Sequence, residues 1–349
     1  MTITSSKKVL KFSRKCLKNM IPATESGIME RGANLLFHKN RTAIERNPRW
    51  QRTRKLTNWS EEFMLVGGIE AGGTKFVCAV GNEKNELLER VAFPTTTPEE
   101  TLEQVFAFFD RFDLAAIGIG SFGPIDVNKD SETYGHILST PKLAWKDFDF
   151  LGAMKARYAV PMGWTTDVNG AALGESALGA AKGMKNIMYI TIGTGVGAGA
   201  IVDGKILEGI GHPEMGHILV RPHEDDHYEG FCPYHGNCLE GMAAGPSIDG
   251  RLGKAGKDVE PTDAVWDYIA YYIAQALEAY TVILRPERIV LGGGVMKVPG
   301  MLDNIKAKFT KLLADYVPVP AVDDYLVLPG LGDDAGITGA IILSNEVYA

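Results

Sequence analysis

Two cysteines and two histidines fall close together in a glycine-rich segment of the chain. Cys232, His235 and Cys238 are spaced as Cys-x-x-His-x-x-Cys, and His217 precedes them. Two thiolates and two imidazoles form the ligand set of a closed, tetrahedral structural zinc site. The segment, residues 211–246, has little hydrophobic periodicity, so a bound metal ion would supply the free energy that orders it. We therefore expect a structural Zn²⁺ ion rather than incidental cysteines and solvated histidines.

Two glutamates flank the expected metal ligands. Glu214 lies before His217, and Glu240 lies just after Cys238. Neither carboxylate is needed as a ligand, because Cys and His already fill a four-coordinate site. Both side chains therefore remain free to bind another group.

A glycine-rich turn separates two expected strands, at 65–69 and 76–80. Such a turn can aim successive backbone N–H groups at an anion, with a Thr hydroxyl and a Lys ammonium as helpers. It is not a P-loop, because Gly-x-x-x-x-Gly-Lys is missing and a strand follows rather than a helix. An ordinary hairpin turn is the alternative. The turn consists of Gly72, Gly73, Thr74 and Lys75.

Two further glycine turns follow expected strands, at 187–192 and 288–291. The first of these loosely matches a dinucleotide fingerprint, but residues 201–207 indicate a hairpin where that motif needs a helix. It instead resembles the turn after residues 65–69, and two such turns facing each other would clamp a polyphosphate. The two turns consist of Gly193, Thr194 and Gly195, and of Gly292, Gly293 and Gly294.

Two further candidates stand where strands end. Asp167 precedes a small-residue helix expected at 171–178. It could cap that helix, since a carboxylate is stabilised at a helix N-terminus, or it could be a general base for a substrate hydroxyl. The strand at 115–120 runs into Gly123 and Pro124, and a strand that stops in this way often begins a ligand loop.

The composition indicates a globular protein. The chain has 349 residues, 45% of them hydrophobic and 23% charged, which favours two lobes over one core. No apolar run approaches the roughly 18 residues that span a membrane, so no membrane partner is expected. Four cysteines, two of them closely spaced, do not make a disulfide framework and favour a reducing, cytoplasmic setting.

The first 60 residues differ sharply in charge from the rest. They hold 14 Lys/Arg against three Asp/Glu, a net charge of +11, whereas the remainder carries −18. Residues 1–63 could form a nucleic-acid-binding arm or a targeting presequence. They lack a clean helix-turn-helix, so nucleic acid is not an expected partner. We favour a basic, disordered extension outside the folded enzyme, with Met64 as a natural initiator.

Four segments together resemble the sugar kinases of the ROK family (repressors, open reading frames and kinases), within the actin/hexokinase superfamily. The resemblance covers about residues 64–349. Many members have a Cys-x-Cys-Gly-x-x-Gly-Cys zinc segment, whereas His235 between two cysteines resembles the bacterial fructokinase branch. The family often has Asp where this chain has Glu70. The segments are GIEAGGTK at 68–75, TDVNGAALGE at 166–175, GHPEMGH at 211–217 and CPYHGNCLEG at 232–241.

The resemblance implies an α/β, two-lobed actin/hexokinase-like fold, that is, a duplicated ribonuclease H-like fold with a zinc-bound loop. The small lobe would comprise residues 64–178, with the last helix, 333–349, returning to it. The large lobe would comprise residues 179–332 and carry the zinc loop, 211–246. Family members also suggest a homodimer and closure of the lobes over the sugar.

The same resemblance implies ATP-dependent phosphorylation of a hexose, foremost D-fructose to fructose 6-phosphate. Asp167 would be the general base, and the first two glycine turns would hold the phosphates with Mg²⁺. The third turn would pass under the adenosine. His217 would use one ring nitrogen for zinc and one for the sugar. The sugar-binding residues would be Gly123, Pro124, Asp167, Glu214, His217 and Glu240.

Two alternatives remain open. A ROK kinase could instead act on glucose, mannose or an N-acetylhexosamine, because sugar choice depends on the shape of loops. A sugar-responsive transcriptional repressor of the same family is an alternative of another class. It would need a winged helix-turn-helix in the N-terminal arm, which lacks that pattern, and its phosphate motifs could decay, whereas those here are intact.

Overall fold

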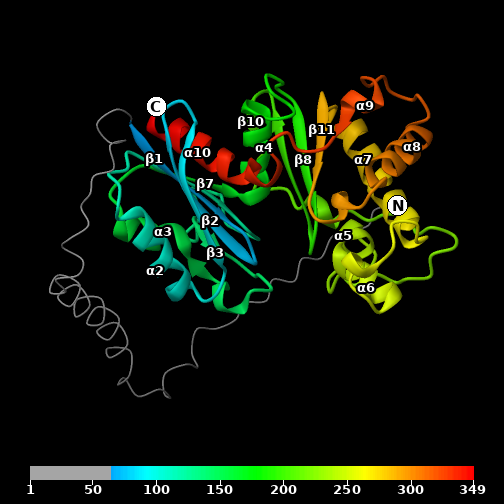
Figure 1. Ribbon diagram of the computed structural model, residues 1–349, viewed down its shortest axis with the longest axis horizontal. Coiled ribbons are helices and arrows are strands. Elements are labelled where there is room, and N and C mark those ends of the chain that lie inside the picture. The colour runs from blue at the N-terminus through cyan, green and yellow to red at the C-terminus, as the bar shows by residue number, and fades with distance from the viewer. Residues whose placement is uncertain (1–63) are drawn as a thin grey trace, which may run out of the picture. The chain divides into compact units, whose positions relative to one another are not determined.

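The computed structural model of the protein describes residues 64–349 (Figure 1). The prediction of a basic extension over residues 1–63 lies outside the described residues. No helix within residues 64–349 combines the length and the apolar character needed to cross a membrane.

The first of two large sheets has five strands in the order β3-β2-β1-β4-β7. β2 is antiparallel to both of its neighbours, whereas β1, β4 and β7 run parallel to one another. The parallel strands therefore end at the same edge of the sheet. The strands span Leu65–Ala71 (β1), Lys75–Asn82 (β2), Leu87–Pro94 (β3), Ile117–Ser121 (β4) and Met162–Thr166 (β7).

The second sheet repeats the first strand for strand, in the order β10-β9-β8-β11-β12. Its β9 is antiparallel to both neighbours, and β8, β11 and β12 run parallel. This repetition confirms the duplicated α/β fold that the resemblance implied. The strands span Ile187–Ile192 (β8), Val196–Val202 (β9), Lys205–Ile206 (β10), Arg288–Gly292 (β11) and Leu326–Val327 (β12).

Alternation along β8 shows how the second sheet is covered on both faces. Met188, Ile190 and Ile192 belong to the core that includes α7 and α8, whereas Tyr189 packs with α4. Successive side chains of a strand point to opposite faces, so the continuous apolar run at 187–192 is that of a strand buried on both sides. Figure 1 shows α4 on one side of β8 and β11 and α7 and α8 on the other. These helices span Asp167–Ala177 (α4), Val265–Leu284 (α7) and Met301–Leu313 (α8).

The first sheet packs α2 (Pro98–Phe109) and α3 (Phe150–Arg157) against one face. The other face accepts the last helix, α10 (Ala335–Tyr348), because glycines replace side chains there. A Cβ atom at Gly118 would lie 2.0 Å from the Ala340 carbonyl oxygen, and one at Gly163 would lie 2.5 Å from Leu343 Cγ. The C-terminal helix can thus rest directly on the strand backbones.

Local features fix where three elements of the chain begin or end. The helix expected at 171–178 begins at Asp167, because Thr166 caps it through a hydrogen bond from Asn169 N–H. Residues 148–149 form a short strand, β6, and α3 follows directly, capped by Asp149 through a hydrogen bond from Gly152 N–H. α8 ends at Leu313, because the next two residues have positive φ.

Short elements complete the described chain. They are β5 (His136–Ile137), β6 (Phe148–Asp149), α5 (Leu239–Ala243), α6 (Gly245–Leu252), α9 (Val322–Tyr325) and the 3₁₀ turns Leu143–Trp145, Met215–His217, Gly256–Asp258, Val295–Lys297 and Gly332–Asp334.

Candidate functional site

A cavity of about 1060 Å³ lies where strands of both sheets end. Residues of all three glycine turns reach it, although they are far apart in the sequence. Ligands of open α/β sheets bind at the carboxyl ends of the strands, so this cavity is the candidate site. The predicted residues that line it are Thr74, Lys75, Asp167, Gly193, Gly292, Gly293 and Gly294.

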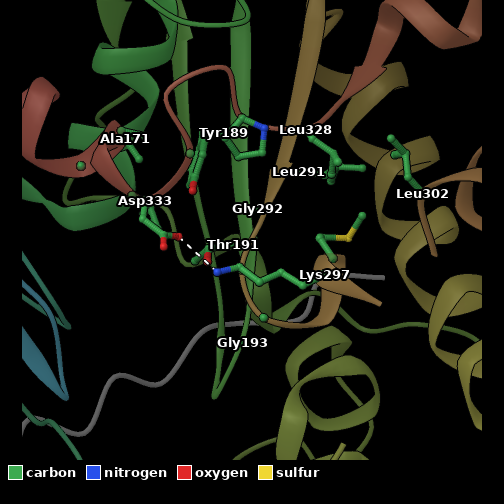
Figure 2. Close-up of a pocket in the computed structure, with 18 of the residues that line it drawn as sticks. Ala171, Tyr189, Thr191, Gly193, Leu291, Gly292, Lys297, Leu302, Leu328 and Asp333 are labelled. Atoms are coloured by element: carbon green, nitrogen blue, oxygen red, sulfur yellow. Dashed lines mark hydrogen bonds and ion pairs between the residues drawn. The ribbon is translucent and has the colours of Figure 1, made fainter. Parts of the chain in front are cut away.

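The cavity has an apolar side and a charged side. Figure 2 shows Leu291, Leu302 and Leu328 on the opposite side of the view from Asp333. Lys297 Nζ lies 3.3 Å from Asp333 Oδ1. An apolar wall beside lysines and glycine turns suits a ligand with one flat apolar ring and one polyanionic end. The sequence did not single out any of these five side chains, because none stands in a recognisable motif.

The first two turns leave backbone donors free. Gly72 N–H donates to the Lys75 carbonyl over 2.9 Å, and Gly193 N–H donates to the Gly195 carbonyl over 2.8 Å. Each turn is thereby closed on itself. Within residues 64–349 no hydrogen bond occupies the N–H groups at the tips, and successive free N–H groups form an anion-binding concavity. These tip residues are Gly73, Thr74, Thr194 and Gly195.

Asp167 occupies the first position of α4 but does not cap it, since that role belongs to Thr166. Asp167 Oδ1 accepts a hydrogen bond from Val168 N–H over 2.8 Å. Burial raises the pKa of Asp167 to about 6, and the hydrogen bond from Val168 opposes this shift. At neutral pH the group is therefore an anion that can still accept a proton, which is the state a general base needs.

Glu70 is a second carboxyl group of the cavity, and the sequence marked it only as a departure from the family pattern. Its Oε2 is buried and has no hydrogen-bond partner within residues 64–349. Burial, followed by the charge of Asp167, raises the pKa of Glu70 to about 7, while Lys75 lowers it. Its position at the end of β1, just before the first turn, is the signal that could have identified it.

A second group of polar residues lies next to Asp167. A Cβ atom at Gly120 would lie 3.4 Å from Asp167 Cα, and one at Gly123 would lie 3.6 Å from His212 Nε2. His212 Nε2 is in turn 2.8 Å from Glu214 Oε1. The loop after β4 thus meets the segment that carries Glu214, with Asp167 close to both. His212 was not predicted, because a single histidine in a loop carries no spacing signal.

Glu240 connects the metal-binding segment to the second glycine turn. Its Oε2 accepts a hydrogen bond from Val196 N–H over 3.0 Å. A Cβ atom at Gly195 would come within 2.7 Å of the same oxygen, so the turn depends on glycine here. Glu240 lies in the first turn of α5, which Cys238 caps.

The predicted residues that do not line the large cavity are Gly72, Gly73, Gly123, Pro124, Thr194, Gly195, Glu214, His217 and Glu240, together with Cys232, His235 and Cys238.

The four predicted metal ligands converge on one point. Their ligand atoms all lie within 4.8 Å of one another. His217 Nδ1 is 3.7 Å from Cys232 Sγ and 3.5 Å from Cys238 Sγ, and His235 Nδ1 is 3.8 Å from Cys232 Sγ. Ordinary zinc bond lengths place tetrahedral sulfur and nitrogen ligands about 3.5 Å apart, so the residues fit a metal ion. Since His217 turns Nδ1 to the cluster, its Nε2 stays available for another partner.

Replacing Glu70 with Gln removes a carboxyl group whose folded-state pKa is raised from 4.5 to about 7. As pH rises from about 4.5 to about 7, Glu70 lowers the unfolding free energy of the wild type, because the unfolded chain releases the Glu70 proton at a lower pH than the folded chain. We expect the variant to exceed the wild type in unfolding free energy by roughly 2–3 kcal/mol at pH 8 and to equal it near pH 4. Urea denaturation across this pH range measures the difference.

The control is Glu103→Gln, which changes an exposed carboxylate of α2. It should leave the pH dependence of stability unchanged. A Glu70→Gln variant whose unfolding free energy equals that of the wild type from pH 4 to pH 8 would contradict the assignment of a buried carboxyl group with a raised pKa at this position.

Comparisons with known proteins show which family this chain resembles in sequence and fold. A model of the ROK family matches residues 66–347. The fructokinase of Streptococcus mutans is 50% identical to the chain, and the match covers 82% of this chain and 99% of that protein. The fructokinase of Pediococcus pentosaceus is also 50% identical, and the match covers 81% of this chain and 98% of that protein. The crystal structure of a ROK hexokinase from Thermus thermophilus superimposes with a TM-score of 0.67 at 26% identity, covering 80% of this chain and 98% of that one. The chain belongs to the ROK family.

Proposed function

We propose that the protein transfers the γ-phosphoryl group of ATP to O6 of D-fructose, giving fructose 6-phosphate and ADP. The observation that carries this proposal is the position of Asp167. It lies between the cavity lined by the glycine turns and the polar group formed by Gly123, His212 and Glu214. The name fructokinase of relatives at 50% identity supports the choice of sugar.

The nucleotide fits the two-sided cavity. The third glycine turn and the apolar wall suit the adenosine, and the free N–H groups of the first two turns suit the phosphates. Lys75 adds a positive charge on the same side. Mg²⁺ prefers carboxylate and phosphate oxygens, and Glu70, whose buried Oε2 has no partner within residues 64–349, is the carboxylate of this cavity that would hold it. When bound, Mg²⁺ neutralises charge that develops on the phosphates.

The chemical step needs one base and an in-line approach. The fructose O6–H donates its proton to the Asp167 carboxylate while O6 forms a bond to the γ-phosphorus. The bond from the γ-phosphorus to the β–γ bridging oxygen breaks, and ADP leaves with that electron pair. Asp167 is ionised above its pKa of about 6, so it can accept this proton at neutral pH.

The remaining sugar hydroxyls have acceptors on the metal-binding segment. Glu214 lies beside Asp167, and Glu240 is fixed by the Val196 amide at the second turn. Carboxylates pair well with adjacent hydroxyl groups, because each oxygen accepts from one donor. His217 would add Nε2, since Nδ1 turns to the metal cluster. The proposed sugar loop also includes Gly123 and Pro124.

We propose Zn²⁺ for the cluster of two cysteines and two histidines. The ion would act as a structural brace, because four protein ligands leave no open coordination position for a substrate. It would hold the 211–246 segment so that His217 and Glu240 keep their positions. A homodimer, closure of two lobes over the sugar and a cytoplasmic location stay predictions from the resemblance and the cysteine content.

The substrate is tested by measuring ADP release with ATP, Mg²⁺ and a panel of hexoses. We expect kcat/KM for D-fructose to exceed that for glucose, mannose and N-acetylglucosamine by at least about 10-fold, because contacts to a polar substrate group discriminate strongly. Turnover of another hexose in preference to fructose would keep the reaction and change the substrate. Absence of turnover with every hexose would contradict the kinase proposal and favour the repressor alternative.

Asp167→Asn removes the proposed base while keeping the size of the side chain. Turnover should fall by about 10²–10⁴-fold, whereas fructose binding measured by calorimetry should remain. In the wild type, kcat/KM should fall as pH decreases below about 6, since protonated Asp167 cannot accept a proton. Asp315→Asn, at an exposed position after α8, is the matched control. Full activity of Asp167→Asn would exclude the role of base.

Cys238→Ala tests the metal site. Elemental analysis should find about one Zn²⁺ per chain in the wild type and none in the variant. The variant should also melt at a lower temperature than the wild type. Fructose turnover should fall with it. Cys78→Ala removes a buried thiol outside the cluster and should retain the metal. Metal-free wild-type protein with unchanged melting and turnover would refute the brace.

A further inference from the structure

His212 is a largely buried polar side chain next to the proposed sugar site, and the proposed mechanism does not use it. Its side chain is 10% exposed, whereas that of its partner Glu214 is 50% exposed. Nε2 lies 2.8 Å from Glu214 Oε1. Nδ1 is buried and has no hydrogen-bond partner within residues 64–349.

The pairing decides which ring nitrogen carries the proton. An ionised carboxylate only accepts hydrogen bonds, so Nε2 carries the hydrogen and donates it to Glu214. In the neutral ring Nδ1 is then an unpaired, buried acceptor. Buried polar atoms are nearly always paired, and an apolar side chain would fill the same space without this cost. Packing alone therefore does not account for a histidine at this position.

The surroundings of the ring place it at the junction of the site. A Cβ atom at Gly123 would lie 3.6 Å from His212 Nε2, so the loop after β4 passes directly beside the ring. Both His212 and Glu214 act electrostatically on Asp167, since Glu214 raises the pKa of Asp167 and His212 lowers it. The pair thus lies between the loop after β4 and the proposed base.

We propose that His212 is a positioning residue of the sugar site, whose Nε2–H holds the Glu214 carboxylate in the orientation that receives a hexose hydroxyl. This inference rests on the proposed function and names a residue that determines sugar affinity. Glu214 is half exposed and has several rotatable bonds, so a free side chain would lose conformational entropy on binding the sugar. The buried His212 ring holds the Glu214 carboxylate in place before the sugar binds, so that less conformational entropy is lost on binding.

The test compares kinetic constants of four variants with the hexose that the wild type prefers. His212→Leu removes the donor and should raise KM for the hexose about tenfold, with KM for ATP within about twofold of the wild type. His212→Gln keeps an N–H at a similar reach and should restore most of the affinity. His212→Asn is too short to reach Glu214 and should behave like His212→Leu. His227→Leu changes an exposed histidine of the same segment and is the control.

A double-mutant cycle shows whether His212 acts through Glu214. In the Glu214→Ala background, His212→Leu should have little further effect on KM for the hexose, because the carboxylate that it orients is gone. Effects that simply add would overturn the proposal. If His212→Leu fails to fold, the contrast between His212→Gln and His212→Asn decides the question in the same way.

Two failures can be told apart. If the wild type phosphorylates a hexose but His212→Leu, or His212→Asn, matches the His227→Leu control in every constant, only the role of His212 is overturned. If the wild type phosphorylates no hexose, the proposed function fails and this role fails with it. A rise in KM for the hexose alone, rescued by Gln and absent without Glu214, supports the proposal.

Discussion

The close crossing of α4 and α10 is the constraint on which the site depends. A Cβ atom at Gly339 would lie 1.7 Å from the Gly170 carbonyl oxygen, so the two helices meet backbone to backbone. α4 begins with Asp167, and α10 begins beside Glu70, where a Cβ atom at Gly336 would lie 2.7 Å from Glu70 Cδ. Because α10 also rests on the glycines of the first sheet, one packing arrangement fixes both carboxyl groups.

That arrangement has an electrostatic consequence. Two carboxyl groups share one cavity, and burial raises the pKa of each above its ordinary value. Such groups destabilise the folded protein at neutral pH, because their charged forms are poorly solvated. A phosphoryl-transfer site can use them, since a base must hold its proton loosely and a metal–nucleotide complex brings positive charge. At the place where the two helices start, burial therefore lowers the stability of the fold and provides two reactive carboxyl groups.

The second part of the site is ordered differently. The segment from residue 211 to 246 contains little regular structure, and four of its side chains converge on the Cys and His cluster. Its apolar residues, among them Val220, Leu239 and Met242, pack into the core of the second sheet. Two carboxylates near the ends of this segment belong to the proposed sugar site. Glu214 is paired with His212, and Glu240 accepts a hydrogen bond from the Val196 amide. The proposed metal ion and these hydrogen bonds would therefore position Glu214 and Glu240, as helix packing positions Asp167 and Glu70.

Local features of this protein could be predicted from the order of neighbouring residues. Glycine turns after apolar strands, the Cys-x-x-His-x-x-Cys spacing and the junction at Asp167 were all predicted, because each depends on neighbouring residues. Three features became visible only in the folded chain: Glu70 is buried beside Asp167, His212 pairs with Glu214, and α10 lies on a face of glycines. These features join segments far apart in the chain, and their chemistry comes from burial and distance, which residue type and spacing do not specify.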